Sequence, residues 1–145
     1  MKSSEIISLL PYSKPFLFVD ELEEITEEGA KGSYTFPADS FFYEGHFKEF
    51  PVTPGVILTE CMAQIGTVSL GIFLLKDLFN ENGKVALTNT KIDFYLPVYP
   101  GEKVRVLSEK VYFRFNKLKC KVSMYNAKDK LVSRGEISGM IKENE

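Results

Sequence analysis

The sequence has few of the residues that most often bind metal ions. It contains one histidine, His46, and two cysteines, Cys61 and Cys120, which stand far apart in the chain. The cysteine and histidine spacings of structural zinc sites cannot be assembled from this set, so we expect no metal site within one chain. The net charge of −2 likewise gives no general reason to expect binding to nucleic acid.

The chain also lacks a recognisable secretion signal. The apolar run in residues 1–11 is short, is interrupted by Glu5 and Ser8, and is followed by no small-residue cleavage pattern. The sequence contains no Asn-x-Ser/Thr acceptor for glycosylation. We therefore expect a cytoplasmic protein with reduced thiols.

The composition is that of a globular protein. Of 145 residues, 44% are hydrophobic, 13% aromatic and 26% charged. These apolar side chains offset the entropy of ordering the chain, which argues against disorder or a fibrous repeat. Because this length is near the commonest domain size, we expect one domain over residues 1–145.

The first third of the chain predicts a short helix followed by a hairpin. The helix spans residues 4–10 and stops at Pro11. Residues 16–25 read as one long strand, and residues 31–36 as its partner across a turn at residues 27–29.

A long apolar helix is predicted from Thr53 to about Phe79. Thr53 can cap it, and Pro54 suits its first position because the missing N–H costs nothing there. Residues 61–75 are apolar or small on every side, which indicates burial. Polar side chains, Glu60 among them, interrupt the first half, so we expect a core helix rather than a membrane span.

The second half of the chain is rich in strand formers. Runs at residues 84–96, 102–115, 118–126 and 130–141 are separated by proline, glycine, asparagine and aspartate residues that favour turns. With the first hairpin they give an antiparallel sheet of about six strands that wraps the long helix. The predicted fold class is α+β.

Charge is distributed unevenly between the two halves. Residues 1–53 hold 4 basic and 10 acidic side chains, whereas residues 102–131 hold 9 basic and 3 acidic. One interpretation of the basic excess is lysines alternating on solvated strand faces. The other is a basic surface that attracts an acidic partner, and the position of these residues on the sheet distinguishes the two.

Glu60 is the most informative residue, because it lies in the second turn of a helix that otherwise excludes charge. A buried carboxylate must pair, be hydrogen-bonded or take up a proton. No lysine or arginine lies within a turn or two, whereas Gln64 at i+4 can hydrogen-bond the carboxyl group. This favours a positioned carboxylic acid. The alternative is an exposed glutamate favoured by the helix dipole.

His46 lies in a loop, residues 37–53, that holds two prolines, one glycine and five aromatic residues. A histidine in such a setting is most often a packing residue. This loop, however, leads into the helix of Glu60, where the free N–H groups of Gly55 and Val56 can receive negative charge. A base, an acid and an anion-binding helix start are the three parts that an elimination reaction requires.

Three short motifs follow one another: Gly-His-Phe in the loop, Pro-Gly-Val at the helix start and Glu-x-Met-Ala-Gln on the helix. The sequence also contains five further matching segments: Leu9-Leu10-Pro11, Pro15-Phe16-Leu17-Phe18-Val19-Asp20, Pro51, Leu96-Pro97-Val98 and Pro100-Gly101-Glu102. This combination closely resembles the FabZ-type β-hydroxyacyl-[acyl-carrier-protein] dehydratases over nearly the whole chain. The fold of that family is the hotdog, a long helix wrapped by an antiparallel sheet, in agreement with the plan above.

The resemblance implies a homodimer, often a trimer of dimers, with His46 of one chain facing Glu60 of the other. The substrate would be an acyl chain on the phosphopantetheine arm of an acidic acyl carrier protein that docks on basic residues. Neutral His46 would remove the α-proton and protonated Glu60 would protonate the leaving hydroxyl. Gly55 and Val56 would stabilise the enolate and Gln64 would hold the carboxyl. Neither a metal nor an organic cofactor is required.

The chain departs from the family at residues 48–50, where Lys-Glu-Phe replaces the usual Pro-Gly-Lys. A glycine at position 49 adopts positive φ freely, whereas Glu49 is strained there and adds bulk and charge, so the family pattern does not fix the path of this loop. The departure suggests a dehydratase for a polyene or other secondary acyl chain. Two alternatives remain on the same fold: an acyl thioesterase, which needs a carboxylate but no histidine base, and a catalytically silent subunit that binds acyl carriers.

Overall fold

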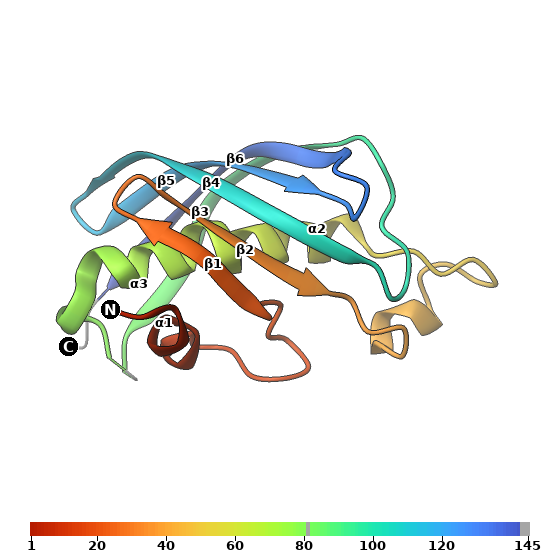
Figure 1. The fold of residues 1–145 in the computed structure, drawn as a ribbon, viewed down its shortest axis with the longest axis horizontal. Coiled ribbons are helices and arrows are strands. Elements are labelled where there is room, and N and C mark those ends of the chain that lie inside the picture. Colours follow the sequence, from red (N-terminus) through yellow and green to blue (C-terminus); the bar gives the residue numbers. More distant parts are fainter. Residues whose placement is uncertain (81, 143–145) are drawn as a thin grey trace.

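The computed structural model describes residues 1–80 and 82–142, and it wraps a six-stranded antiparallel sheet around one long helix (Figure 1). The sheet order is β1-β2-β4-β5-β6-β3, and the short helix α1 (Ser3–Leu9) precedes it in the chain. The predicted α+β hotdog architecture is confirmed. The described strands are β1 (Glu21–Thr26), β2 (Gly29–Thr35), β3 (Lys84–Phe94), β4 (Lys103–Arg114), β5 (Lys117–Tyr125) and β6 (Leu131–Lys142).

The central helix is continuous but not uniform. The backbone N–H and the hydroxyl of Ser69 both donate to the carbonyl of Gln64, the hydroxyl at 2.7 Å, which widens the helix by one residue. This bulge changes which side chains face the sheet beyond that point. In order, the helix comprises α2 (Gly55–Met62), a π-helical segment (Ala63–Val68), α3 (Ser69–Leu75) and a 3₁₀ turn (Lys76–Leu78).

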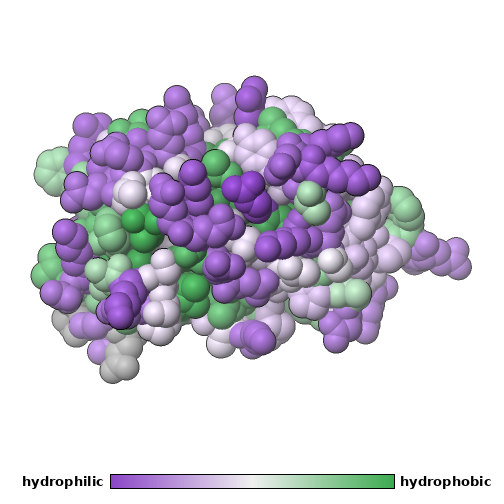
Figure 2. All heavy atoms as spheres, viewed as in Figure 1, coloured by the Kyte–Doolittle hydropathy of each residue, from purple (hydrophilic) through white to green (hydrophobic). Residues whose placement is uncertain are grey.

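The central helix is a core helix, as predicted. By length and composition Gly55–Leu78 could cross a membrane, but 78% of its most apolar window is buried inside the fold. A buried helix of a globular protein satisfies the same criterion. On the face that looks onto β1 and β2, hydrophilic residues cover most of the surface and hydrophobic residues appear in the gaps between them (Figure 2).

Strand β5 shows how the sheet divides its two faces. Leu118, Cys120 and Val122 are buried towards the helix, and the lysines at positions 119 and 121 alternate with them. Both cysteines of the chain are buried and unpaired. For this strand, alternation between a buried and a solvated face is enough to explain the basic residues, and no binding function is needed.

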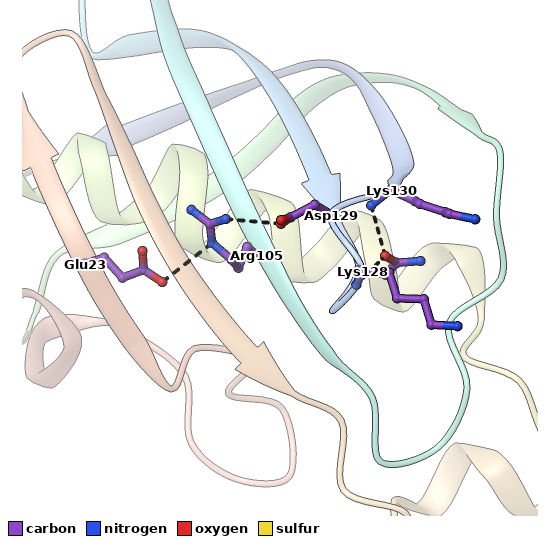
Figure 3. Close-up of polar contacts among 6 residues, drawn as sticks. Glu23, Arg105, Lys128, Asp129 and Lys130 are labelled. Atoms are coloured by element: carbon purple, nitrogen blue, oxygen red, sulfur yellow. Dashed lines mark hydrogen bonds and ion pairs between the residues drawn. The ribbon is translucent and has the colours of Figure 1, made fainter.

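Acidic residues on the outer face compensate part of the predicted basic excess. Arg105 of β4 lies 3.9 Å from Glu23 of β1 and 3.5 Å from Asp129 in the β5–β6 turn (Figure 3). Lys119 lies 3.8 Å from Glu136 on the neighbouring strand. The side chains of these pairs are all at least partly exposed, so each pair contributes little to stability.

The prediction of one strand over residues 16–25 is wrong, because the strand begins only at Glu21. Phe18 and Val19 are buried, but the backbone there pairs with a side chain instead of a strand. The Gln64 amide oxygen accepts the Phe18 N–H at 2.8 Å, and the amide nitrogen donates to the Phe16 carbonyl at 3.0 Å. An apolar run has the same sequence pattern whether its backbone pairs with a strand or with a side chain.

Thr53 does not cap the central helix, contrary to the prediction. The helix is preceded by Pro54 at the N-cap position, and the hydroxyl of Thr53 is 2.6 Å from that of Tyr43. The Thr53 N–H donates to the carbonyl of Val98 at 2.8 Å. Thr53 therefore fastens the aromatic loop to the rest of the fold.

Candidate active site

Glu60 and Gln64 form the fixed part of the candidate site. Glu60 is half-buried in α2, and the fully buried Gln64 amide donates to its carboxyl oxygen Oε2 at 2.9 Å. Gln64 is itself locked by the backbone of Phe16 and Phe18, as described above. The predicted hydrogen bond is present. Because Gln64 is itself held rigidly, this bond restrains the carboxyl group of Glu60.

Glu60 opens onto a cavity of about 220 Å³ between the central helix, β3 and β6. Among the described residues, its other polar side chains come from Tyr12 and Thr67. Such a lining suits an apolar ligand that carries a few polar atoms at one place. The apolar and small lining residues are Phe16, Val68, Val85, Ala86, Leu87, Gly139 and Ile141.

Tyr12 reaches this cavity from the connection between α1 and β1. Burial, and secondarily the negative charge of Glu60, raise the pKa of the Tyr12 hydroxyl far above its ordinary value. The phenol therefore stays protonated at physiological pH and remains a hydrogen-bond donor.

Thr67 carries the one buried side-chain oxygen or nitrogen without a hydrogen-bond partner in residues 1–80 and 82–142. The thiol of Cys120 lies beside it, but the geometry between them is not that of a hydrogen bond. An unpaired buried hydroxyl opposes folding.

Thr67→Val should therefore leave the free energy of unfolding unchanged or raise it by about 1 kcal/mol, because the isosteric methyl group needs no partner. Urea denaturation measures this. Thr53→Val is the matched control: the same replacement breaks the hydrogen bond to Tyr43 and should cost about 1 kcal/mol. Equal losses of unfolding free energy in Thr67→Val and Thr53→Val would contradict the assignment of the Thr67 hydroxyl as unpaired.

His46 has the hydrogen bond that prepares a base. Its ring atom Nδ1 is 2.9 Å from the carbonyl oxygen of Val52, and its ring stacks on that of Phe47 with 4.0 Å between centroids. A carbonyl can only accept, so Nδ1 carries the proton of the neutral imidazole. Nε2 is thus left with a free lone pair.

The loop that carries His46 is a small hairpin. Phe47 and Phe50 exchange backbone hydrogen bonds of 3.0 and 3.1 Å, and the Val52 N–H donates to the His46 carbonyl at 2.9 Å. The hairpin extends beyond the start of α2 (Figure 1). Glu49 has φ of 58°, so this position has the left-handed conformation that glycine adopts freely and that strains a glutamate.

Glu49→Gly should raise the free energy of unfolding by about 0.5–1 kcal/mol, since it removes left-handed strain at a modest entropic cost. Chemical denaturation measures the change. Lys48→Gly is the control, because φ at Lys48 is not positive and glycine there only adds freedom to the unfolded chain. If Lys48→Gly stabilised the protein and Glu49→Gly did not, the prediction would be contradicted.

At the helix start, two backbone amides donate to no residue that the structure describes. The first donors of the helical ladder are Ile57 and Leu58, which bond to the Pro54 carbonyl at 2.9 and 3.1 Å. The N–H groups of Gly55 and Val56 precede that ladder, as predicted. A side chain on Gly55 would come within 3.2 Å of the Phe94 ring on β3, so glycine lets the two elements approach.

Comparison with known proteins identifies the family. Residues 10–138 match the model of the FabA-like domain. The chain belongs to the FabA-like family. The 3-hydroxyacyl-[acyl-carrier-protein] dehydratase FabZ of Clostridium perfringens is 35% identical over 114 residues, which cover 79% of this chain and 80% of that one. The FabZ protein of Petrotoga mobilis is 33% identical over 145 residues, with coverage of 99% and 100%. The predicted resemblance is confirmed.

Solved structures agree on the fold of this FabA-like chain. The dehydratase heterocomplex ApeI:P from Xenorhabdus doucetiae matches with a TM-score of 0.79 at 11% identity, covering 100% of this chain and 93% of that one. A hypothetical thioesterase with coenzyme A from Streptococcus pneumoniae matches with a TM-score of 0.61 at 10% identity, covering 86% and 88%. At such identities these likenesses concern the fold alone.

Within one FabA-like chain, the predicted site residues fall into two groups. Glu60 lines the cavity and is hydrogen-bonded to Gln64 behind it, whereas His46 is not among the lining residues. Tyr12 and Phe16 are additional lining residues that the sequence analysis missed, because no spacing rule places the connection after Pro11 against the helix. In the described ranges, no group of three metal-ligating side chains is positioned to hold an ion.

Proposed function

We propose that this FabA-like protein converts β-hydroxyacyl-[acyl-carrier-protein] to the trans-2-enoyl thioester in fatty-acid or related acyl-chain biosynthesis. The observation that carries the proposal is the carboxyl group of Glu60, held by a locked amide at the wall of an apolar cavity. An acyl chain fits the apolar wall, and its β-hydroxyl can meet the carboxyl. The names of the FabZ relatives support the same reaction.

The chemistry assigns a role to each group. Nε2 of His46 removes the α-proton, the electron pair forms the Cα–Cβ double bond, and Glu60 protonates the β-hydroxyl, which leaves as water. A positioned acid or base of this kind contributes roughly 10²–10⁴ in rate. The amides of Gly55 and Val56 would bind the thioester oxygen of the enolate, at about 2.7–4 kcal/mol for each well-placed donor. Gln64 keeps the acid in place.

The site is proposed to be completed by a second copy of the chain, with His46 of one chain beside Glu60 of the other. Every residue of β3 other than Val85 and Ile92 is exposed, and β3 is an edge strand that pairs only with β6 in the described sheet. Val56, at the helix start beside that edge, is 77% exposed. These features support a homodimer, which can assemble further into a trimer of dimers.

The proposed substrate carrier is an acidic acyl carrier protein, and the proposed compartment is the cytoplasm. Recognition would use basic side chains on the subunit surface, together with the phosphopantetheine arm that delivers the acyl group. A docking test is direct: substrate linked to acyl carrier protein should have a lower KM than the same acyl group on pantetheine alone.

The deciding assay follows enoyl absorbance and free thiol together, with 3-hydroxybutyryl-acyl-carrier-protein as the probe. Enoyl formation without thiol release supports the dehydratase. Thiol release without reversible hydration of the enoyl thioester would identify a thioesterase, and carrier binding with neither reaction a silent subunit. Faster turnover of polyunsaturated than of short saturated substrates would support the specialised role suggested by residues 48–50.

A further inference from the structure

We propose that Tyr12 is a second hydrogen-bond donor of the active site, which holds the leaving hydroxyl of the substrate opposite Glu60. This inference rests on the dehydratase function proposed above and adds a residue to it. Tyr12 follows Pro11 directly, in the connection from α1 to β1, and is half-buried against the hydrophobic core.

The cavity brings the two side chains to one place. Tyr12 and Glu60 line the same 220 Å³ space, and the third polar lining residue, Thr67, is fully buried beside Cys120. The rest of the lining is apolar or small. A hydroxyl group on a bound acyl chain therefore finds its polar partners at Glu60 and Tyr12, and an apolar wall elsewhere.

The protonation behaviour of Tyr12 suits this task. The charge of Glu60 adds to burial in raising the Tyr12 pKa, so the two groups are electrostatically coupled. Tyr12 stays protonated even when Glu60 is ionised, and it can donate before and after proton transfer. Its hydroxyl makes no hydrogen bond to any residue in the described ranges, so the donor is available to a ligand.

Glu60 leaves room for this second donor. Its Oε2 atom accepts from Gln64, while Oε1 accepts no hydrogen bond in the described part of the chain. In the elimination, the Cβ–O bond breaks as the proton of Glu60 moves to the departing oxygen, and the electron pair from the α-carbon forms the double bond. Tyr12 keeps its own proton throughout and donates a hydrogen bond to that oxygen, which stabilises the charge that develops on it.

Tyr12→Phe is the test, because it removes the hydroxyl and keeps the ring that lines the cavity. We expect kcat/KM for 3-hydroxybutyryl-acyl-carrier-protein to fall about 3- to 10-fold, the effect of one neutral hydrogen bond. The inhibition constant of butyryl-acyl-carrier-protein, which has no β-hydroxyl, should change by less than about twofold. A role in shaping the cavity would move both constants together.

Tyr34→Phe is the matched control, since Tyr34 is also partly buried but lines a different cavity with Pro15, Phe41 and their neighbours. It should leave both constants unchanged. Equal kcat/KM for Tyr12→Phe and wild type, or parallel losses with the two ligands, would overturn the inference. A wild-type protein that forms no enoyl product would instead overturn the proposed function, so the two failures are distinguishable.

Discussion

His46→Ala and Glu60→Gln should each lower kcat for dehydration by about 10²–10⁴, the usual contribution of a positioned acid or base. Both side chains are only half-buried, and each makes one side-chain hydrogen bond, so the fold should survive both changes. Circular dichroism and thermal denaturation verify this. Full activity in both variants would contradict the assigned roles.

The two variants together test whether the site is shared between chains. If His46 of one subunit serves Glu60 of the other, mixed dimers of His46→Ala and Glu60→Gln contain one intact site. Random association would then restore about a quarter of the wild-type sites. Co-expression with two affinity tags isolates the mixed species, and its kcat per dimer should be about half that of wild type.

The control reverses the arrangement. A mixed dimer of the wild-type chain with a chain carrying both substitutions has no intact shared site, because each site combines one wild-type and one altered residue. It should therefore be inactive. Activity in this dimer, together with inactivity of the His46→Ala and Glu60→Gln mixture, would place both groups of a site on one chain.

The fold was predictable where one periodic pattern dominates. Residues 61–75 are apolar all round, which only a buried helix explains, and the alternation from Lys117 to Tyr125 marks a strand with one solvated face. Residues 16–19 could not be assigned correctly, because their apolar run satisfies its backbone through the side chain of Gln64, 46 residues away from Phe18. Local propensity contains no information about such a partner.

In the candidate site, too, some features were predictable from the sequence and others were not. Glu60 and Gln64 were predictable because i and i+4 residues are neighbours on any helix. The free Nε2 of His46 was not predictable, because it depends on the turn that brings the Val52 carbonyl within hydrogen-bond distance of the imidazole ring. Tyr12 was missed because it lies on the connection that leads into residues 16–19, whose path Gln64 fixes and which shares the cavity of Glu60. One buried amide thus connects the correct and the missed parts of the site.

Gln64→Leu should accordingly have the largest effect on stability of any single change considered for this chain. Leucine fills a similar volume but leaves the Phe18 N–H and the Phe16 carbonyl without partners, at about 1–3 kcal/mol for each group that stays buried. We expect the free energy of unfolding to fall by roughly 2–5 kcal/mol in urea denaturation. The melting temperature should fall by about 5–15 °C.

The same substitution should lower kcat even at temperatures where the variant is folded, because Glu60 loses the donor that fixes its carboxyl group. Ser69→Ala is the comparison: it removes the 2.7 Å hydrogen bond to the Gln64 carbonyl but leaves the side-chain amide in place, and should cost about 1 kcal/mol. If Gln64→Leu were no less stable than Ser69→Ala, the amide could not be the connection between the loop and the helix. If it were less stable but fully active, Gln64 would support the fold without positioning the acid.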